Sequence, residues 1–151
     1  MDYVFVLDVS GSMNEDGKLS LSRNSLDAFI RALGEEDRFD VITFNVAANN
    51  LFRELRPADD FAQERAQEFL MQQEARGGTF LEPAIRAAYL YKDPDRPMNV
   101  VILSDGMTEQ RERKTLLQLI GERPSSTRVF AIGVGKFHDL SHTTPKLTGA
   151  T

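Results

Sequence analysis

The chain has 151 residues, a length that suits one domain with its own hydrophobic core. Its 18 basic and 23 acidic residues give a net charge of −5 without a basic cluster, so nucleic acid is not an expected partner. Cysteine is absent, which excludes disulfide bonds and thiolate metal ligands, and no apolar run reaches the roughly 20 residues that membrane insertion of a helix requires.

An apolar run at 3–7 predicts the first strand, and because Met1 lies so close to it the chain is expected to be a domain taken from a longer protein. Apolar residues at helical spacing over 26–33 then predict a helix. Short β-branched and aromatic runs at 38–44 and 51–55 predict the second and third strands. The short link between them favours an antiparallel hairpin, which places the third strand at an edge of the sheet.

Strands and helices continue to alternate in the second half of the chain. Asp60 and Gln63 have the pattern of a capping box, which would start the next helix. Further elements are predicted as helices over 62–70, 81–89 and 109–120 and as strands over 99–104 and 128–134. Both late strands have the apolar pattern of buried strands, and the 99–104 strand is expected to lie centrally. The alternation predicts an α/β fold, namely a doubly wound, Rossmann-like, mostly parallel central sheet with one antiparallel edge strand and helices on both faces.

The stretch from Asp8 to Ser12 follows the first predicted strand directly. Asp8, Ser10 and Ser12 offer only oxygen donors, which suit a hard cation such as Mg²⁺ better than zinc or copper. Three donors are too few for an octahedral ion, so further oxygens must come from elsewhere. Thr79 follows a glycine-rich turn, and Asp105 follows the apolar 99–104 strand. We therefore predict a metal site formed by these five residues at the carboxyl edge of the sheet, where α/β proteins bind ligands.

A simpler interpretation applies to the first three of these residues. Asp and Ser commonly cap helices and form turns, and Asp8, Ser10 and Ser12 taken alone would be explained in that way. That interpretation weakens once Thr79 and Asp105 are included, because capping does not require two carboxylates and three hydroxyls at one edge of a sheet.

In this order and context the five residues resemble the metal-ion-dependent adhesion site (MIDAS) of von Willebrand factor type A domains. Within that family the sequence is most similar to inter-alpha-trypsin inhibitor heavy chains and their bacterial relatives. Segments 39–45 and 129–135 also resemble core strands of the family. The resemblance implies a C-terminally shortened type A domain over 1–135, followed by an irregular tail over 136–151 in place of the family's last helix. The sequence does not identify the compartment, and an extracytoplasmic or cell-surface part of a larger protein is favoured over a cytoplasmic one.

The resemblance also implies how the site would act. Ser10, Ser12 and Thr79 would contact the ion directly, while Asp8 and Asp105 would act largely through water. The ion would be Mg²⁺, with Mn²⁺ or Ca²⁺ as alternatives. A protein partner would complete the ion's coordination with an Asp or Glu carboxylate, so the expected function is adhesion or protein binding without catalysis.

Two other functions remain open. A phosphatase or phosphotransferase of the haloacid dehalogenase type could use Asp8 as nucleophile, together with Thr43, Asp105 and Lys136. Against it, the second Asp that this chemistry needs as acid and base two residues after the nucleophile is Ser10 here. The other alternative is a structural assembly domain with a vestigial metal site.

Overall fold

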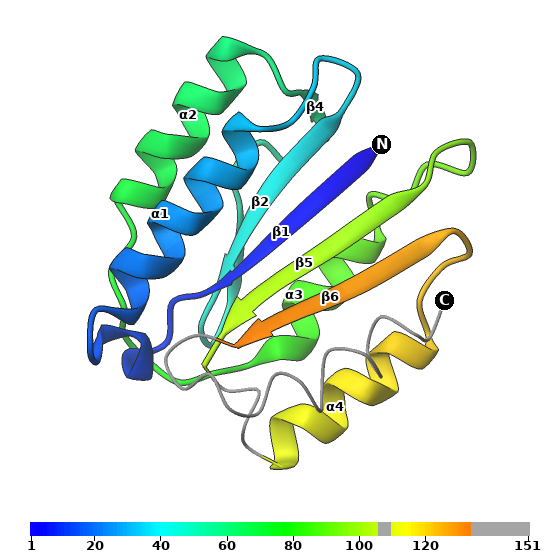
Figure 1. Cartoon of the computed structure of the whole chain (residues 1–151). Helices are drawn as coiled ribbons and strands as arrows, with labels where there is room; N and C mark the ends of the chain where they lie inside the picture. Colours follow the sequence, from blue (N-terminus) through cyan, green and yellow to red (C-terminus); the bar gives the residue numbers. More distant parts are fainter. Residues whose placement is uncertain (106–109, 134–151) are drawn as a thin grey trace.

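One sheet organises the computed structural model, in which residues 1–105 and 110–133 are described (Figure 1). Four strands run parallel, namely β1 (Asp2–Asp8), β2 (Arg38–Phe44), β5 (Met98–Ser104) and β6 (Thr127–Gly133). The order is β3-β2-β1-β5-β6, and the short strands β3 and β4 both pair with β2. β1 is thus the middle strand, while β5 is an interior strand beside it, as its nearly continuous apolar sequence predicts.

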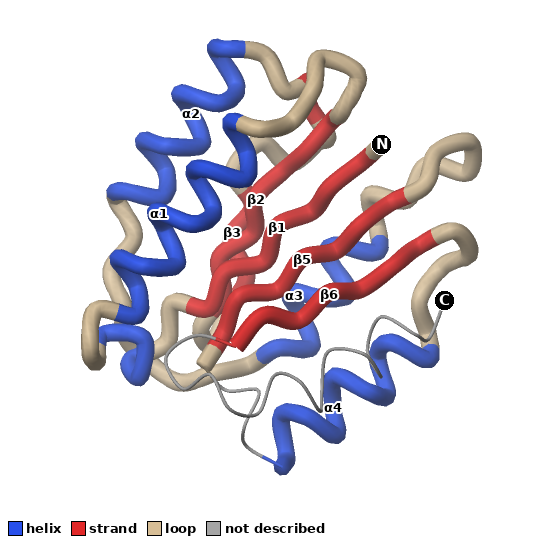
Figure 2. The backbone as a smooth tube through the Cα atoms, viewed as in Figure 1, coloured by secondary structure: helices blue, strands red, loops and turns tan. Residues whose placement is uncertain are grey.

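Helices cover both faces of the sheet, which confirms the predicted doubly wound α/β fold (Figure 2). α1 (Lys18–Arg31) and α2 (Asp60–Met71) lie on one face, whereas α3 (Leu81–Tyr89) and α4 (Gln110–Gly121) lie on the other. A 3-10 helix, η1 (Gly11–Asn14), precedes α1. No helix in this described part of the chain combines the length and apolar character that crossing a membrane requires.

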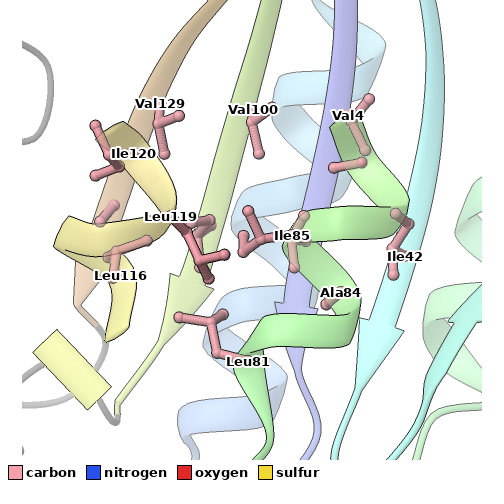
Figure 3. Packing of buried hydrophobic residues seen from close by; sticks show 14 of the residues in the cluster. Val4, Ile42, Leu81, Ala84, Ile85, Val100, Leu116, Leu119, Ile120 and Val129 are labelled. Carbon is pink, nitrogen blue, oxygen red and sulfur yellow. The ribbon is translucent and has the colours of Figure 1, made fainter. Parts of the chain in front are cut away.

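The face covered by α3 and α4 shows how apolar residues at helical spacing build the core (Figure 3). Leu81 and Ile85 of α3, with Leu116 and Ile120 of α4, are buried against the sheet. They meet residues of four parallel strands, namely Val4, Ile42, Val100 and Val129. Burying an aliphatic side chain of this size contributes about 1.5–3 kcal/mol, so this layer is a major source of stability.

The outer edge of the sheet differs from the single strand predicted over 51–55. Two shorter strands, β3 (Ala48–Asn50) and β4 (Arg56–Pro57), pair antiparallel with opposite ends of β2. Between them the buried Asp40 carboxylate accepts hydrogen bonds from two successive backbone N–H groups, at 2.9 and 3.1 Å. The second belongs to Arg53, whose left-handed backbone, with φ of 61°, interrupts a strand. The antiparallel edge is confirmed, but it is broken into two pieces.

α2 is capped one residue earlier than the predicted capping box implies. Its N-cap is Asp59, whose Oδ1 accepts a hydrogen bond of 2.8 Å from the N–H of Ala62. The Gln63 side chain instead donates to the carbonyl of Ile30 at 3.1 Å and ties α2 to α1. The prediction was wrong by one residue because Asp59 and Asp60 are adjacent and both have the chemistry of an N-cap.

β6 is not buried on both faces as its apolar sequence predicts. Val129 and Ala131 are buried and Phe130 between them is partly buried, whereas Arg128 and Ile132 on either side of this stretch are exposed. Within the described ranges β6 is therefore an edge strand that is covered on one face. The predicted irregular tail over 136–151 lies outside the described residues.

Candidate metal centre

The carboxyl edge of the sheet brings the turn after β1 close to the end of β5. β1 lies between β2 and β5. The chain first adds strands on one side of β1, beginning with β2, and later adds β5 and β6 on the other side. Such a reversal of strand order opens a crevice at the carboxyl ends of the strands, where α/β proteins bind ligands. β1 ends at Asp8, and β5 ends at Ser104, directly before Asp105.

Asp8 is completely buried, and both of its carboxylate oxygens accept hydrogen bonds. Oδ1 accepts from the N–H of Ser10 at 2.8 Å, and Oδ2 accepts from the hydroxyl of Ser104 at 2.6 Å. Burial raises the pKa of Asp8 above its ordinary value, the hydrogen bonds from Ser10 and Ser104 oppose the rise, and the Asp105 carboxylate adds to it. The direct partners of Asp8 are therefore neutral donors, which compensate its burial only in part.

Ser12 connects this turn to Asp105. The hydroxyl oxygens of Ser10 and Ser12 lie 3.3 Å apart, and the Ser12 hydroxyl donates to Asp105 Oδ1 at 2.9 Å. Lys18, the first residue of α1, donates from Nζ to Asp105 Oδ2 at 3.1 Å. Four of the five candidate residues thus form one hydrogen-bonded series, in which two hydroxyls lie between the carboxylates of Asp8 and Asp105.

Thr79 lies in the loop between α2 and α3, which contacts the same turn. The N–H of Gly11 donates to the carbonyl of Gly77 at 2.9 Å, and the N–H of Arg76 donates to the carbonyl of Val9 at 2.9 Å. Among the described residues, no hydrogen bond joins the Thr79 side chain to the other four candidates. The structure therefore places the backbone of this loop at the site and leaves the Thr79 hydroxyl outside the hydrogen-bonded series.

Two glycines permit this contact between loop and turn. Gly77 has a left-handed backbone with φ of 81°, and a Cβ added to Gly11 would lie 3.4 Å from the Gly77 carbonyl oxygen. Asn45, which follows β2, holds the loop from its other side. Its side-chain amide donates to the backbone carbonyl of Arg76 at 3.1 Å, and its backbone carbonyl accepts from the N–H of Phe80 at 2.7 Å. A residue with a side chain at position 77 would therefore strain this backbone, whereas a Cβ at position 11 would only touch the loop.

The donor set fits a hard divalent cation such as Mg²⁺. Adjacent ligands of an octahedral ion bound at about 2.1 Å lie about 3 Å apart, close to the 3.3 Å between Ser10 Oγ and Ser12 Oγ. All the side-chain donors are oxygens, which Mg²⁺ prefers. Within the described residues, no three His, Cys, Asp or Glu side chains gather into a metal-binding group. A metal at this edge would therefore depend on serine hydroxyls rather than on an acidic cluster.

Three residues that complete this edge escaped the sequence analysis, namely Ser104, Lys18 and Asn45. Ser104 follows the registered pair Leu7 and Leu103, so it lies level with Asp8, but only the strand register reveals this. Lys18 carried a weak local signal, since a cation in the first turn of a helix opposes the helix dipole and is favoured there when an anion lies nearby.

Two exposed apolar side chains flank the loop that carries Thr79. Val46 and Phe80 are 64% and 54% exposed. They are close in space, because Phe80 is hydrogen-bonded to the neighbour of Val46, and a Cβ added to Gly78 would lie 3.5 Å from Val46 Cγ1. The rim of the candidate centre is therefore partly apolar.

The geometry disfavours the phosphatase alternative. A nucleophilic carboxylate must be reached by the phosphorus atom, yet Asp8 is completely buried with both oxygens hydrogen-bonded. Thr43, which would bind the phosphate, is also completely buried and has no hydrogen-bond partner for its hydroxyl among the described residues. Lys136, the third group of that hypothesis, lies outside the described residues.

Fold and site together define a doubly wound α/β domain with an oxygen-rich candidate cation site at its carboxyl edge. A family model described as "von Willebrand factor type A domain" matches residues 1–148. The chain therefore belongs to the von Willebrand factor type A domain family, whose members are typically adhesion or protein-interaction modules. The comparisons give no support to the haloacid dehalogenase alternative.

Similar proteins agree with this assignment. A von Willebrand factor A domain-containing protein of Dictyostelium discoideum is 33% identical over 141 residues, which cover 91% of this chain and 15% of that protein. The chain thus spans a small part of this relative's length. Among solved structures, a von Willebrand factor type A protein from Catenulispora acidiphila has a TM-score of 0.81 at 21% identity, covering 97% of this chain and 36% of that one. The PilB minor pilin from Streptococcus sanguinis has a TM-score of 0.75 at 14% identity, covering 99% and 53%.

Proposed function

We propose that this chain is a Mg²⁺-dependent protein-binding module, with Mn²⁺ or Ca²⁺ as alternative ions. The observation that carries the proposal is the hydrogen-bonded series of Asp8, Ser10, Ser12 and Asp105, which sets two neutral hydroxyls side by side between two carboxylates. Ser10 and Ser12 would contact the ion, and Asp8 and Asp105 would hold their hydroxyls and the bound water. Thr79 would be the third hydroxyl, brought in by its loop.

The ligand follows from the charge of these donors. A divalent ion held mainly by neutral hydroxyls and water keeps much of its positive charge and can take an Asp or Glu carboxylate from a partner as a further ligand. The protein's own residues orient this event, because Asp8 fixes the backbone N–H of Ser10 and Asp105 accepts the Ser12 hydroxyl. Val46 and Phe80 offer apolar contact beside the incoming carboxylate.

The wider setting belongs to the same proposal. We propose a type A domain that ends near residue 135 and is followed by an irregular tail over 136–151. We also propose that the chain is inter-alpha-trypsin inhibitor heavy chain-like and of bacterial origin; the two solved structures described above are from Catenulispora acidiphila and Streptococcus sanguinis, whereas the relative described above is from Dictyostelium discoideum.

The first experiment is thermal unfolding of the chelator-treated protein during titration with Mg²⁺ and Mn²⁺. A ligand that binds only the folded state adds about 2.7 kcal/mol of stability at a hundred times its dissociation constant, so wild type should show a saturable rise in Tm. Ser12→Ala should lose the rise, whereas the control Ser20→Ala, on the exposed side of α1, should keep it. A wild-type protein that does not respond to millimolar metal would contradict the proposal.

A second experiment separates the competing functions. Partner binding that requires added metal, and that Ser12→Ala abolishes, would support the binding module. Full partner binding by Ser12→Ala would instead support the structural assembly domain with a vestigial site. Turnover of a phosphoester that disappears in Asp8→Asn would support the enzyme.

A further inference from the structure

Lys18 is a cation built into the candidate metal centre. Its Nζ lies 3.1 Å from Asp105 Oδ2, while the other oxygen of the same carboxylate accepts the Ser12 hydroxyl at 2.9 Å. Both members of the ion pair are withdrawn from solvent, with 16% of the Lys18 side chain and 9% of the Asp105 side chain exposed. The pair is therefore less screened than an ion pair on the open surface.

The place of Lys18 in the fold is unfavourable for a lysine on local grounds. It is the first residue of α1, where the helix dipole favours anions, and no acidic residue occupies the first turn. Its preceding residue, Gly17, has a left-handed backbone with φ of 68°. The local preferences of α1 thus do not explain a cation here, but the contact with Asp105 does.

The charges of the site can be added directly. The carboxylates of Asp8 and Asp105 contribute −2 and Lys18 contributes +1, so the three residues together carry −1. A divalent ion would change this sum to +1, whereas without Lys18 the loaded site would be neutral. Glu15 and Asp16 lie nearby and act on Lys18, but both are exposed and are screened by water.

We propose that Lys18 strengthens the preference of the site for anionic oxygen ligands, since it keeps the metal-loaded centre positive at the expense of metal affinity. This proposal rests on the proposed metal-dependent function. Lys18 repels the entering metal ion and shares Asp105 with it, which weakens metal binding. The same positive charge then attracts a carboxylate to the loaded centre. A residue that merely supports the fold would not move these two affinities in opposite directions.

The test compares Lys18→Met, which keeps the aliphatic chain and removes the charge, with Lys18→Arg, which keeps the charge. Lys114→Met, at an exposed position on α4, is the matched control for loss of a lysine. Titration calorimetry with Mg²⁺ and Mn²⁺ measures metal affinity. We expect Lys18→Met to bind metal roughly threefold to tenfold more tightly than wild type, and both other variants to resemble wild type.

The second measurement uses acetate as the carboxylate and Mn²⁺ as the loaded ion. Acetate that replaces metal-bound water lowers the water-proton relaxation enhancement of the Mn²⁺-loaded protein, and titration gives its dissociation constant. We expect Lys18→Met to bind acetate roughly threefold to tenfold more weakly than wild type. Lys18→Arg should retain acetate binding.

The outcomes separate this proposal from the proposed function. If wild type binds metal and acetate but Lys18→Met weakens both affinities or changes neither, the assignment of Lys18 is overturned while the binding function stands. If wild type binds metal and no acetate, carboxylate capture fails, and Lys18 has no preference for anionic ligands to strengthen. If neither wild type nor Lys18→Met binds metal, both proposals are overturned.

Discussion

Asp2 and Asp8 lie at opposite ends of β1, both completely buried, and their pKa values are shifted in opposite directions. At the amino end, Arg38 and Arg96 donate to Asp2 at distances from 2.7 to 3.0 Å. Burial alone would raise the pKa of Asp2, but the hydrogen bonds and charges of the two arginines outweigh burial and lower it. At the carboxyl end, Asp8 has hydroxyl and backbone donors, and burial raises its pKa.

The two ends of β1 differ in how the charge of the buried carboxylate is compensated. The amino end holds a buried charge with its counter-ions already supplied by the chain, and the three residues link β1, β2 and the loop before β5. The carboxyl end holds a buried charge that neutral donors satisfy only in part. An external cation would complete that compensation, which supports the metal site proposed at this edge.

Asp40 in the middle of β2 is a third case. It is completely buried and accepts hydrogen bonds from the Tyr91 hydroxyl and from the backbone N–H groups of Val41, Phe52 and Arg53. Burial nevertheless raises its pKa, against the effect of these donors. Neutral donors therefore leave part of the cost of burial in place at Asp40 as at Asp8, whereas the arginines remove it at Asp2.

The largest expected effect follows from removing the charge of Asp2. Asp2→Asn leaves two arginines, each about one third exposed, without their shared carboxylate, and should lower the free energy of unfolding by about 3 kcal/mol. Urea unfolding measures this. The control Asp27→Asn breaks an exposed pair with Arg31 on α1 and should change stability by less than about 0.5 kcal/mol. Equal effects of the two substitutions would show that the buried Asp2 cluster contributes no more stability than an exposed ion pair.

The next effect tests the neutral donors of Asp40. Tyr91→Phe removes a hydroxyl that donates to this buried carboxylate and should lower the free energy of unfolding by about 2 kcal/mol, because hydrogen bonds to charged groups are the stronger kind. Tyr89→Phe is the matched control, since the Tyr89 hydroxyl donates to a neutral carbonyl, that of Leu119, at 2.8 Å. Its cost should be about 1 kcal/mol. A larger cost for Tyr89→Phe would contradict the comparison.

Asp8→Asn should change the free energy of unfolding in the opposite direction. The substitution removes a buried charge without a direct cation, and the Ser104 hydroxyl can turn to accept from the new amide, so the metal-free protein should become more stable by on the order of 1 kcal/mol. The rise of Tm with Mg²⁺ should disappear in the same variant. Urea unfolding with chelator present measures the first effect, with Asp27→Asn as the neutral control. Destabilisation of the metal-free protein would refute this account of Asp8.

The smallest signal is the pH dependence of these differences. The pKa of Asp2 is lowered in the folded state, so its contribution is present above the ordinary value of 3.8 and is lost as pH falls through the folded pKa. The pKa of Asp8 is raised, so its contribution is present below 3.8 and is lost as pH rises through the folded pKa. Urea unfolding of metal-free wild type and both Asn variants from about pH 3 to about pH 7 should show the two differences growing with opposite signs.

Most strands and helices were predictable from local hydrophobic periodicity. The apolar runs that became β1, β2 and β5 and the helical spacing in α1, α2 and α3 were sufficient for the fold class, because periodicity reflects which side of an element is buried. The same reasoning failed for 51–55 and for the second face of β6. At 51–55 a distant carboxylate, Asp40, takes the backbone donors, and β6 is apolar although it lies at an edge among the described strands.

The amino-acid sequence by itself determined the type of element along most of the chain and the oxygen chemistry of Asp8, Ser10 and Ser12, since both depend on residues near one another. Only the tertiary structure decided which distant groups meet. The register of β1 and β5 places Ser104 beside Asp8, and the packing of α1 brings Lys18 to Asp105. The loop between α2 and α3 leaves the Thr79 hydroxyl outside the hydrogen-bonded series. Contacts between such residues depend on strand order and crossovers, which no local spacing encodes.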